Sequence, residues 1–245
     1  MDTVKIAIIG AGNVGSHLYK AFFAAGRDVE LISSRHIHPS VADKDIILIT
    51  VSDSAINEVA MALSHQLKDF NGVVTHTAGS VGMEILTPYF KNYGVFYPLQ
   101  TFSANIDIED YDAIPIFIEG NSEETEKKIH QLADGVFKNI YHYNSVKRKR
   151  LHLASVFACN FVNALYGIAN DILTQDTIPF EVLKPLIGQT ARKIQEHSPE
   201  TCQTGPAVRG DLKVINEHLE TLKENPELQL IYKVISDRIM NKRKK

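Results

Sequence analysis

The sequence predicts a doubly wound, mostly parallel α/β sheet followed by an all-helical domain. Apolar, β-branched runs alternate with helix-like stretches through the first 146 residues, a pattern typical of parallel sheets. A glycine-rich turn directly follows the first run, and from residue 147 onward only helical patterns remain. We therefore expect a sheet domain over residues 1–146 and a helical domain over residues 147–245.

Composition and charge are those of an ordinary globular protein, but the charge is unevenly placed. The chain has 245 residues, of which 44% are hydrophobic and 22% charged. Residues 1–146 hold 10 Lys and Arg against 18 Asp and Glu, whereas residues 147–245 hold 16 against 11. Two basic runs, 147–150 and 242–245, carry this excess. We interpret them as a solvated hinge and a frayed tail, and expect no nucleic-acid partner.

We expect a cytoplasmic protein. Cys159 and Cys202 are too few for a disulfide framework, and the N-terminus lacks the basic region of a signal peptide. Residues 151–170 carry no charge and could span a bilayer by length. Polar residues such as His152 and Asn160 would be costly in hydrocarbon, so we expect a buried helix and no membrane contact.

The first strand, turn and helix indicate a dinucleotide site. The run Val4–Ile9 leads into a GxGxxG turn, the helix-like stretch Ser16–Ala25 and a second run, Val29–Ile32. In this context the turn predicts a Rossmann cofactor site, where the helix N-terminus binds a pyrophosphate. The turn residues expected to hold the cofactor are Gly10, Ala11, Gly12, Asn13, Val14 and Gly15.

The end of the second strand favours NADP over NAD. NAD sites usually place Asp or Glu there to bind the ribose 2′-hydroxyl. Here the strand ends in Ser33, Ser34 and Arg35, with no acid before Asp43. Two hydroxyls and a guanidinium suit a 2′-phosphate, although Arg35 alone could be a solvated charge.

Further strands are expected at 45–51, 73–75, 94–97 and 114–118. Ligands of open α/β sheets bind outside the carboxyl ends of the strands, so the residues there should line one crevice. Capping or loop chemistry is an equally good explanation for each residue singly; Ser52 or Asp53, for example, could cap the next helix. The candidates for cofactor contact are Val51, Ser52, Asp53, Ile56, Thr77, Ala78 and Gly79, and those for a catalytic role are Ser80 and Gln100.

Helices are expected at Leu151–Leu173, Phe180–His197, Asp211–Glu224 and Pro226–Met240. The first is apolar on most sides, which favours burial. In so small a domain a partner subunit would have to cover part of it, so we expect a homodimer through the helical domain.

The long helix also carries a candidate proton-exchanging group. At 100° per residue, His152, Cys159 and Asn163 fall on one stripe, with Asn160 about 80° away. His is the side chain best suited to proton exchange near neutral pH. A hydrogen-bonded structural His with interhelical Asn contacts is the alternative interpretation.

A rigid loop at 204–211 carries two further candidates. Arg209 could hold a substrate carboxylate, and Asp211 could either act at the site or cap the next helix. No metal site is expected, because His36 and His38 have no third ligand near them in sequence.

The assembled motifs resemble those of bacterial NADP oxidoreductases that join a Rossmann domain to an uncharacterised helical C-terminal domain. The motifs are GAGNVG at 10–15, TVSDSAI at 50–56, HTAGS at 76–80, YPLQTFS at 97–103, HLASVFACN at 152–160 and TGPAVRGD at 204–211. The domain plan is similar to those of pyrroline-5-carboxylate reductase, prephenate dehydrogenase and the 3-hydroxyacid dehydrogenases. This resemblance implies that the substrate lies between the nicotinamide and the first long helix.

Single residues agree with these families only in part. Prephenate dehydrogenases have a His near the start of the long helix, and His152 is placed similarly. The 3-hydroxyacid dehydrogenases use Lys and Asn four residues apart. Here Val156 precedes Asn160 by four residues, so their lysine mechanism does not carry over.

The sequence thus predicts an NADP-dependent oxidoreductase acting on a small polar, carboxylated substrate. His152 is expected to exchange the proton, Asn160 to orient the substrate and Arg209 to bind its anionic group. One alternative is an imine reductase of the pyrroline-5-carboxylate reductase type. Another, from a different class, is a non-catalytic NADP-binding sensor or scaffold.

Overall fold

The computed structural model describes residues 4–242, and the chain divides into two compact units at residues 160 and 161. We call them unit 1 (up to Asn160) and unit 2 (from Phe161). The domain boundary expected at 146/147 lies ahead of this division, because the first turns of the long helix pack on the sheet; that boundary stays a prediction. Of the expected basic tail, only Lys242 lies within the described residues, where it pairs with Glu200.

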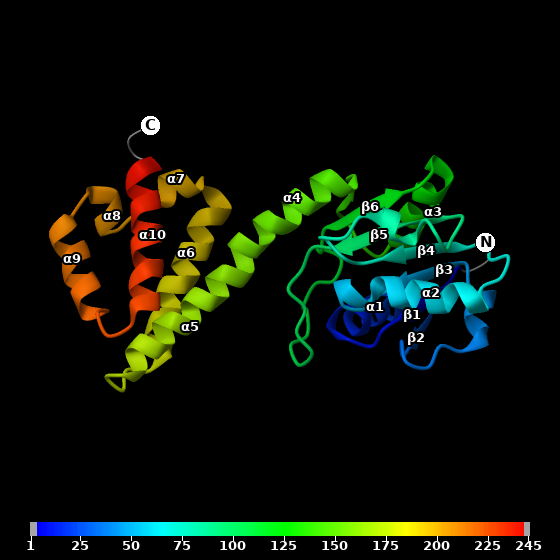
Figure 1. The fold of residues 1–245 in the computed structure, drawn as a ribbon, viewed down its shortest axis with the longest axis horizontal. Helices are drawn as coiled ribbons and strands as arrows, with labels where there is room; N and C mark the ends of the chain where they lie inside the picture. The colour runs from blue at the N-terminus through cyan, green and yellow to red at the C-terminus, as the bar shows by residue number, and fades with distance from the viewer. Residues whose placement is uncertain (1–3, 243–245) are drawn as a thin grey trace. The chain divides into compact units, whose positions relative to one another are not determined.

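Unit 1 is built on one seven-stranded sheet of order β2-β1-β3-β4-β5-β6-β7 (Figure 1). All neighbouring strands are parallel except β5 and β6, which are antiparallel. The prediction of a doubly wound, mostly parallel sheet is confirmed. The strands are β1 (Lys5–Ile9), β2 (Asp28–Ile32), β3 (Ile46–Ile49), β4 (Val73–His76), β5 (Tyr93–Pro98), β6 (Ile116–Gly120) and β7 (Ile140–His142).

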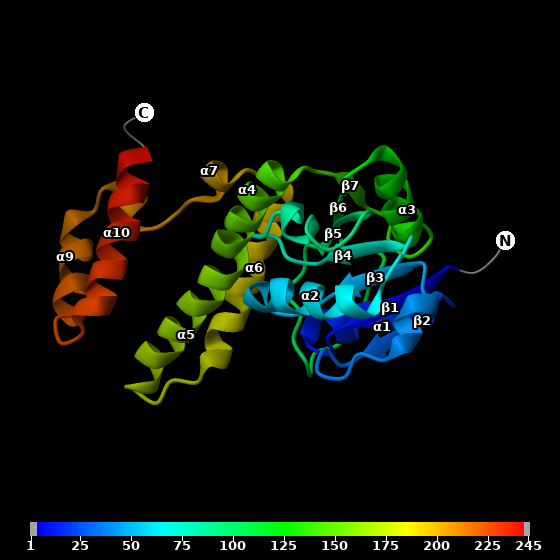
Figure 2. The same cartoon turned by 45° about the vertical axis from the view of Figure 1, so that its right-hand side comes forward.

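Helices cover both faces of this sheet (Figure 2). On one face α1 (Asn13–Ala24) and α3 (Glu123–Ala133) bury Phe22 and Ile129 against the strands. On the other face α2 (Ile56–Gln66) buries Leu63. The start of α4 (Ser145–Ser155) packs Leu151 beside Tyr97 on this second face. The central strands are apolar on both sides because both sides are covered.

Unit 2 is entirely helical in its described part. The regions predicted as helices are helical, but the loop at 199–209 also contains two short helices that the sequence analysis missed. The helices are α5 (Phe161–Thr174), α6 (Lys184–Glu196), α7 (Pro199–Cys202), α8 (Pro206–Arg209), α9 (Leu212–Thr221) and α10 (Pro226–Lys242).

The expected long helix differs from prediction in two ways. A π-helical turn, Val156–Asn160, separates α4 from α5. Because its hydrogen bonds run from residue i to i+5, the even step of 100° that put His152 and Asn163 on one stripe does not hold. The expectation of burial is also wrong for a single chain, since α5 contains no buried residue. The apolar composition of a helix predicts that its surface is buried, but it does not indicate whether the same chain provides the residues that bury it.

Candidate functional site

The glycine turn between β1 and α1 has the shape of a phosphate cradle. Gly10 has φ +120°, which favours glycine, and Thr50 Oγ1 donates to its carbonyl at 2.7 Å. A Cβ on Gly15 would lie 1.9 Å from the Gly10 carbonyl oxygen, so glycine is required for this packing. A Cβ on Gly12 would meet nothing within 4 Å, and no side chain caps α1. The start of α1 therefore has no side-chain cap, and the space beside Gly12 is open, as an anion site needs.

The loop at 99–113 folds against α1 next to this turn. Asn13 donates from Nδ2 to the carbonyl of Phe102 at 3.1 Å. The buried ring of His17 lies 3.0 Å from the Ser103 carbonyl and 2.8 Å from the Tyr111 hydroxyl. Asn13, predicted to contact the cofactor, thus uses its amide to hold this loop. Ala11 is exposed and Val14 is partly buried against the core.

The end of β2 lies beside the glycine turn, because the Gly10 amide donates to the Ile32 carbonyl at 2.8 Å. Arg35 is exposed, and its backbone amide donates to Ser33 Oγ at 3.3 Å. Ser34 is half-buried. The two hydroxyls and the guanidinium predicted to bind a 2′-phosphate therefore follow the strand next to the cradle.

At the ends of β3 and β4, Ser80 donates its hydroxyl to the carboxylate of Asp53. Ser52 pairs with the hydroxyl of Ser54 at 3.3 Å. Neither Ser52 nor Asp53 caps α2 with its side chain, because a short 3-10 turn precedes that helix. Four other predicted cofactor residues at these ends are partly or fully buried: Val51, Ile56, Thr77 and Ala78. Ile56 and Ala78 also belong to the hydrophobic core beside α2.

At the end of β5, Tyr97 forms a polar pair with His152 of α4. The Tyr97 hydroxyl lies 3.1 Å from Nδ1 of His152, and their rings meet edge to face. Burial raises the pKa of Tyr97, while the neighbouring Ser155 hydroxyl and the Arg148 charge act against this rise. The Tyr97 hydroxyl donates to Nδ1 in the tautomer of His152 that carries its proton on Nε2. Gly79 makes room for this pair: a Cβ there would lie 2.6 Å from His152 Nδ1.

A buried ion pair fixes the start of α4. Arg148 is fully buried and pairs with the carboxylate of Glu119 at the end of β6. Arg148 also donates to the Val81 carbonyl at 2.6 Å, and the Ser145 amide and hydroxyl donate to Glu119 at 2.8 and 2.7 Å. The interpretation of the run 147–150 as a solvated hinge is therefore wrong for Arg148. This network sits one helical turn before His152 and holds the helix on the sheet.

His76, at the end of β4, is a second buried histidine. It accepts the Ala78 amide at Nδ1 (3.2 Å), and its Nε2 lies 3.3 Å from the Gly82 carbonyl. Burial lowers its pKa to about 4, and the charge of Arg148 adds to this effect. The ring is therefore neutral near pH 7 and serves the turn at 76–82.

Two further predicted residues of unit 1, Asn160 and Gln100, form no hydrogen bond with this group. Asn160 is exposed at the end of the π-turn, and Gln100 accepts the Thr101 amide at 2.7 Å. In unit 2, Arg209 is exposed and Asp211 caps α9 through the Val214 amide at 3.3 Å. Asp211 thus follows its alternative interpretation as a helix cap.

Residues 4–242 contain no group of three or more His, Cys, Asp and Glu side chains that could hold a metal ion. One helical segment in the same range, Ser145–Thr174, is long and apolar enough to cross a membrane by length and composition alone.

Four residues of this region were missed by sequence reasoning: Thr50, Tyr97, Glu119 and Arg148. Glu119 carried a usable signal, because an acid at the end of an apolar strand predicts a cationic partner. Tyr97 and Thr50 lie within the motifs quoted above, but their positions in predicted strands gave no sign of a role at the site. Only the three-dimensional fold shows that Arg148 is buried while its neighbours Lys147 and Lys149 are exposed.

Several solved structures share this fold over nearly the whole length of the chain. A Bacteroides fragilis protein, provisionally named an NADP oxidoreductase, is 34% identical over 98% of both chains, with a TM-score of 0.87. A Thermotoga maritima protein matches over 98% of both chains at 21% identity, with a TM-score of 0.72. A pyrroline carboxylate reductase from Plasmodium falciparum, solved with NADP bound, shares the fold at 12% identity, with a TM-score of 0.61 over 100% of this chain and 98% of its own.

The predicted resemblance to two-domain oxidoreductases is therefore confirmed at the level of fold and family. A search of curated proteins found no significant match. Residues 114–239 match the family model described as a domain of unknown function, DUF2520. This match spans the last strands of the sheet, the buried ion pair and most of unit 2. On this match and the 34% identity to the Bacteroides fragilis protein, the chain belongs to the DUF2520 family.

Proposed function

We propose that this protein is an NADP-dependent oxidoreductase acting on a small polar, carboxylated substrate. The observation that carries the proposal is the pairing of two features in unit 1. One is the open cradle at Gly12, and the other is the Tyr97–His152 pair at the end of β5. Dinucleotides bind at the carboxyl ends of such strands. The likeness to a named NADP oxidoreductase supports the same assignment.

The residues present fit the cofactor. The amides that open α1 would hold the pyrophosphate, and Arg35 with Ser33 and Ser34 would hold the 2′-phosphate. When bound, the nicotinamide donates or accepts the hydride. In this proposal residues 1–146 bind the cofactor, and residues 147–245 supply substrate and dimer contacts, with Arg209 holding the substrate carboxylate.

His152 would exchange the proton that accompanies hydride transfer. In the tautomer proposed here, the Tyr97 hydroxyl donates to Nδ1 and the ring carries its proton on Nε2. This Nε2–H can be given to a substrate oxygen or nitrogen, and Tyr97 keeps the ring in the tautomer that does so. Tyr97 and Arg148 are positioning residues in this scheme, because they act through His152.

The test is a panel of imines, 2-oxo acids and 3-hydroxy acids with NADPH or NADP, followed by cofactor absorbance. Turnover of an oxo or hydroxy acid supports the proposal, and we expect His152→Ala to lower the rate about 10²–10⁴-fold. Turnover of imines alone would favour the imine reductase alternative. Tight cofactor binding without turnover of any of them would favour the sensor. His142→Ala, at an exposed histidine paired with Glu126, is the matched control.

A further inference from the structure

The chain between β5 and β6 forms a long loop, at 99–113, that contains no helix or strand of its own. Loops longer than about 12–15 residues without secondary structure are uncommon and are usually functional. The Leu99 amide donates to the Pro115 carbonyl at 2.9 Å, and the Lys138 amide donates to the Asp112 carbonyl at 2.8 Å. These bonds fix the two ends of the loop, and helix α1 holds the part between them.

Three polar side chains on one face of α1 contact this loop. Asn13, His17 and Lys20 follow each other at helical spacing, so they lie on the same face. Asn13 donates to the Phe102 carbonyl, and Lys20 pairs with the carboxylate of Asp107. Because α1 begins at the glycine turn, the same helix that forms the cradle also holds the loop.

His17 makes the central contact and is only 2% exposed. Its Nε2 lies 3.0 Å from the Ser103 carbonyl oxygen, which can only accept, so Nε2 carries a proton. In the neutral ring, Nδ1 then accepts from the Tyr111 hydroxyl at 2.8 Å. The ring also packs against Phe102, with centroids 5.2 Å apart. One buried side chain thus ties both the first and the last part of the loop to α1.

The outer contact of the loop contributes less. The side chains of Lys20 and Asp107 are 51% and 81% exposed, and ion pairs as exposed as this one add little to stability. An apolar residue at position 17 would remove both buried hydrogen bonds. The middle of the loop would then be held to α1 by polar contacts of Asn13 and Lys20 alone.

The first part of this loop connects the two halves of the proposed cofactor site. Tyr97 is followed by Pro98, where β5 ends, and by Leu99. The Phe102 carbonyl is bonded to Asn13, directly after the glycine turn. The segment 99–103 therefore runs from the Tyr97–His152 pair to the cradle.

We propose that His17 is a positioning residue that fixes the segment 99–103 beside the cofactor site, and that loosening of this segment limits the release of NADPH. The inference rests on the proposed function, because it takes the cradle as the cofactor site. His17 acts through Ser103 and Tyr111. Loops that close on a ligand commit it to the site, and changes in such contacts alter dissociation rates more than association rates.

The test is stopped-flow release of NADPH from the full chain, followed by cofactor fluorescence, in wild type, His17→Leu and His17→Gln. We expect release at least about tenfold faster in His17→Leu, with an association rate within about twofold of wild type. His17→Gln should release NADPH within about threefold of the wild-type rate, because its amide can both donate to Ser103 and accept from Tyr111.

Two control variants separate this role from a general loss of stability. Leu63→Val removes buried volume on α2, on the other face of the sheet. It should lower stability and leave the release rate unchanged.

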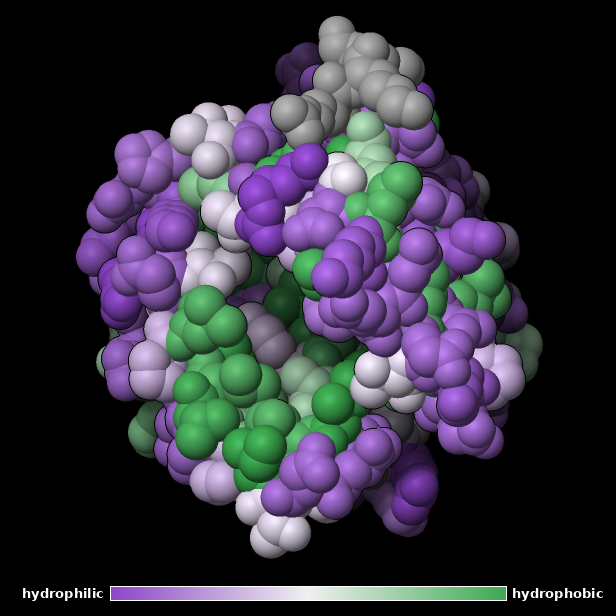
Figure 3. All heavy atoms as spheres, turned by 90° about the vertical axis from the view of Figure 1, so that its left-hand side faces the viewer, coloured by the Kyte–Doolittle hydropathy of each residue, from purple (hydrophilic) through white to green (hydrophobic). Residues whose placement is uncertain are grey.

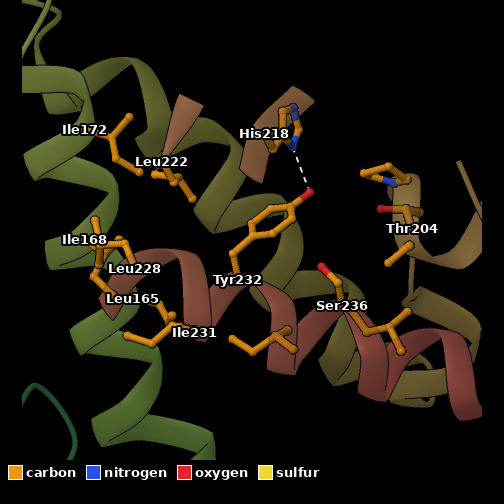
Figure 4. Close-up of a pocket in the computed structure, with 14 residues that line it drawn as sticks. Leu165, Ile168, Ile172, Thr204, His218, Leu222, Leu228, Ile231, Tyr232 and Ser236 are labelled. Carbon is orange, nitrogen blue, oxygen red and sulfur yellow. Dashed lines mark hydrogen bonds between the residues drawn. The ribbon is translucent and has the colours of Figure 1, made fainter. Parts of the chain in front are cut away.

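The second control, His218→Leu, is the same substitution in another histidine–tyrosine pair. His218 Nδ1 also lies 2.8 Å from a tyrosine hydroxyl, that of Tyr232 (Figure 4). This pair lines an apolar groove between α5, α8, α9 and α10 of unit 2. Figure 3 shows hydrophobic residues gathered beside a hollow on this side of the molecule. His218→Leu should release NADPH as the wild type does.

Hydrogen exchange reports on the loop without any cofactor. The Ile106 amide donates to the Ser103 carbonyl at 3.3 Å, and its exchange should be at least about tenfold faster in His17→Leu than in wild type. Unchanged exchange would show that His17 does not hold the loop. Unchanged NADPH release despite faster exchange, or fast release in His17→Gln, would overturn the role of His17 at the cofactor site. A wild type that binds no NADPH would overturn the proposed function and this inference with it.

Discussion

The Tyr97 hydroxyl lies 3.1 Å from Nδ1 of His152, and this pair joins the end of β5 to the middle of α4. Because burial raises the Tyr97 pKa, the phenol remains protonated near neutral pH and is able to donate to the ring. We propose that the His152 ring then carries its proton on Nε2. The pair connects the fold of unit 1 to the chemistry proposed for it.

The first prediction concerns the tautomer of His152. Nitrogen chemical shifts measured by NMR should show an unprotonated Nδ1 and a protonated Nε2 in neutral wild-type protein. In Tyr97→Phe the donor to Nδ1 is gone, so the two tautomers should become mixed while NADPH affinity stays unchanged. A wild-type ring protonated at Nδ1, or one indifferent to Tyr97→Phe, would remove Tyr97 from its positioning role.

The second prediction concerns the space at Gly79. Its missing Cβ would lie 2.6 Å from His152 Nδ1 and 2.7 Å from Tyr97 Cζ, so Gly79→Ala must push the pair apart. We expect a loss of about 1–3 kcal/mol in the free energy of unfolding, with the same mixed tautomers as Tyr97→Phe. Urea unfolding and NMR check this. Full stability and an undisturbed His152 signal in Gly79→Ala would show that the packing is looser than described.

The third prediction concerns the buried ion pair. Arg148→Met leaves the Glu119 carboxylate buried without its cation and should lower the free energy of unfolding by about 3–5 kcal/mol. Adding Glu119→Gln removes the stranded charge, so the double variant should recover part of the loss. Urea unfolding of both single variants and the double variant completes the cycle. Strictly additive losses would mean that the two residues do not interact.

The fourth prediction separates two glycines of the cradle. Gly15→Ala should cost about 3 kcal/mol or more, because its Cβ would lie 1.9 Å from the Gly10 carbonyl oxygen. Gly12→Ala meets nothing within 4 Å and should fold normally, yet bind NADPH at least about tenfold more weakly, since its methyl occupies the phosphate approach. Thermal unfolding and cofactor titration test the contrast, which fails if Gly12→Ala binds as the wild type does.

The fifth prediction concerns acid stability. His76 has a folded pKa of about 4 against an ordinary value of about 6.5. Between these values the unfolded chain binds the extra proton, so stability is fully present above pH 6.5 and is lost as the pH falls toward 4. The loss amounts to at most about 3 kcal/mol. His76→Gln should lack this part of the slope in urea unfolding across that range, whereas parallel curves would contradict it.

The sheet and the glycine cradle could be predicted from the sequence because the residues that indicate them are adjacent in the chain. The strand at Val4–Ile9, for example, is followed directly by the turn that contains Gly10, Gly12 and Gly15. The network of Arg148 and Glu119 joins residues 29 apart in sequence, and nothing nearby in the chain distinguishes Arg148 from Arg150. The π-turn at 156–160 was equally hidden, since its residues also fit a continuous α-helix. The apolar character of α5 was evident, but the absence of cover from its own chain was not.

The central claim is that the cradle and the end of β2 form a site for NADP. Calorimetric titration of wild type and Arg35→Ala with NADPH and NADH tests it most directly. We predict tighter binding of NADPH than NADH, and a loss of about 1.5–3 kcal/mol for NADPH alone in Arg35→Ala, or roughly 10–150-fold. Equal affinity for the two cofactors in the wild type, or unchanged NADPH affinity in Arg35→Ala, would contradict it.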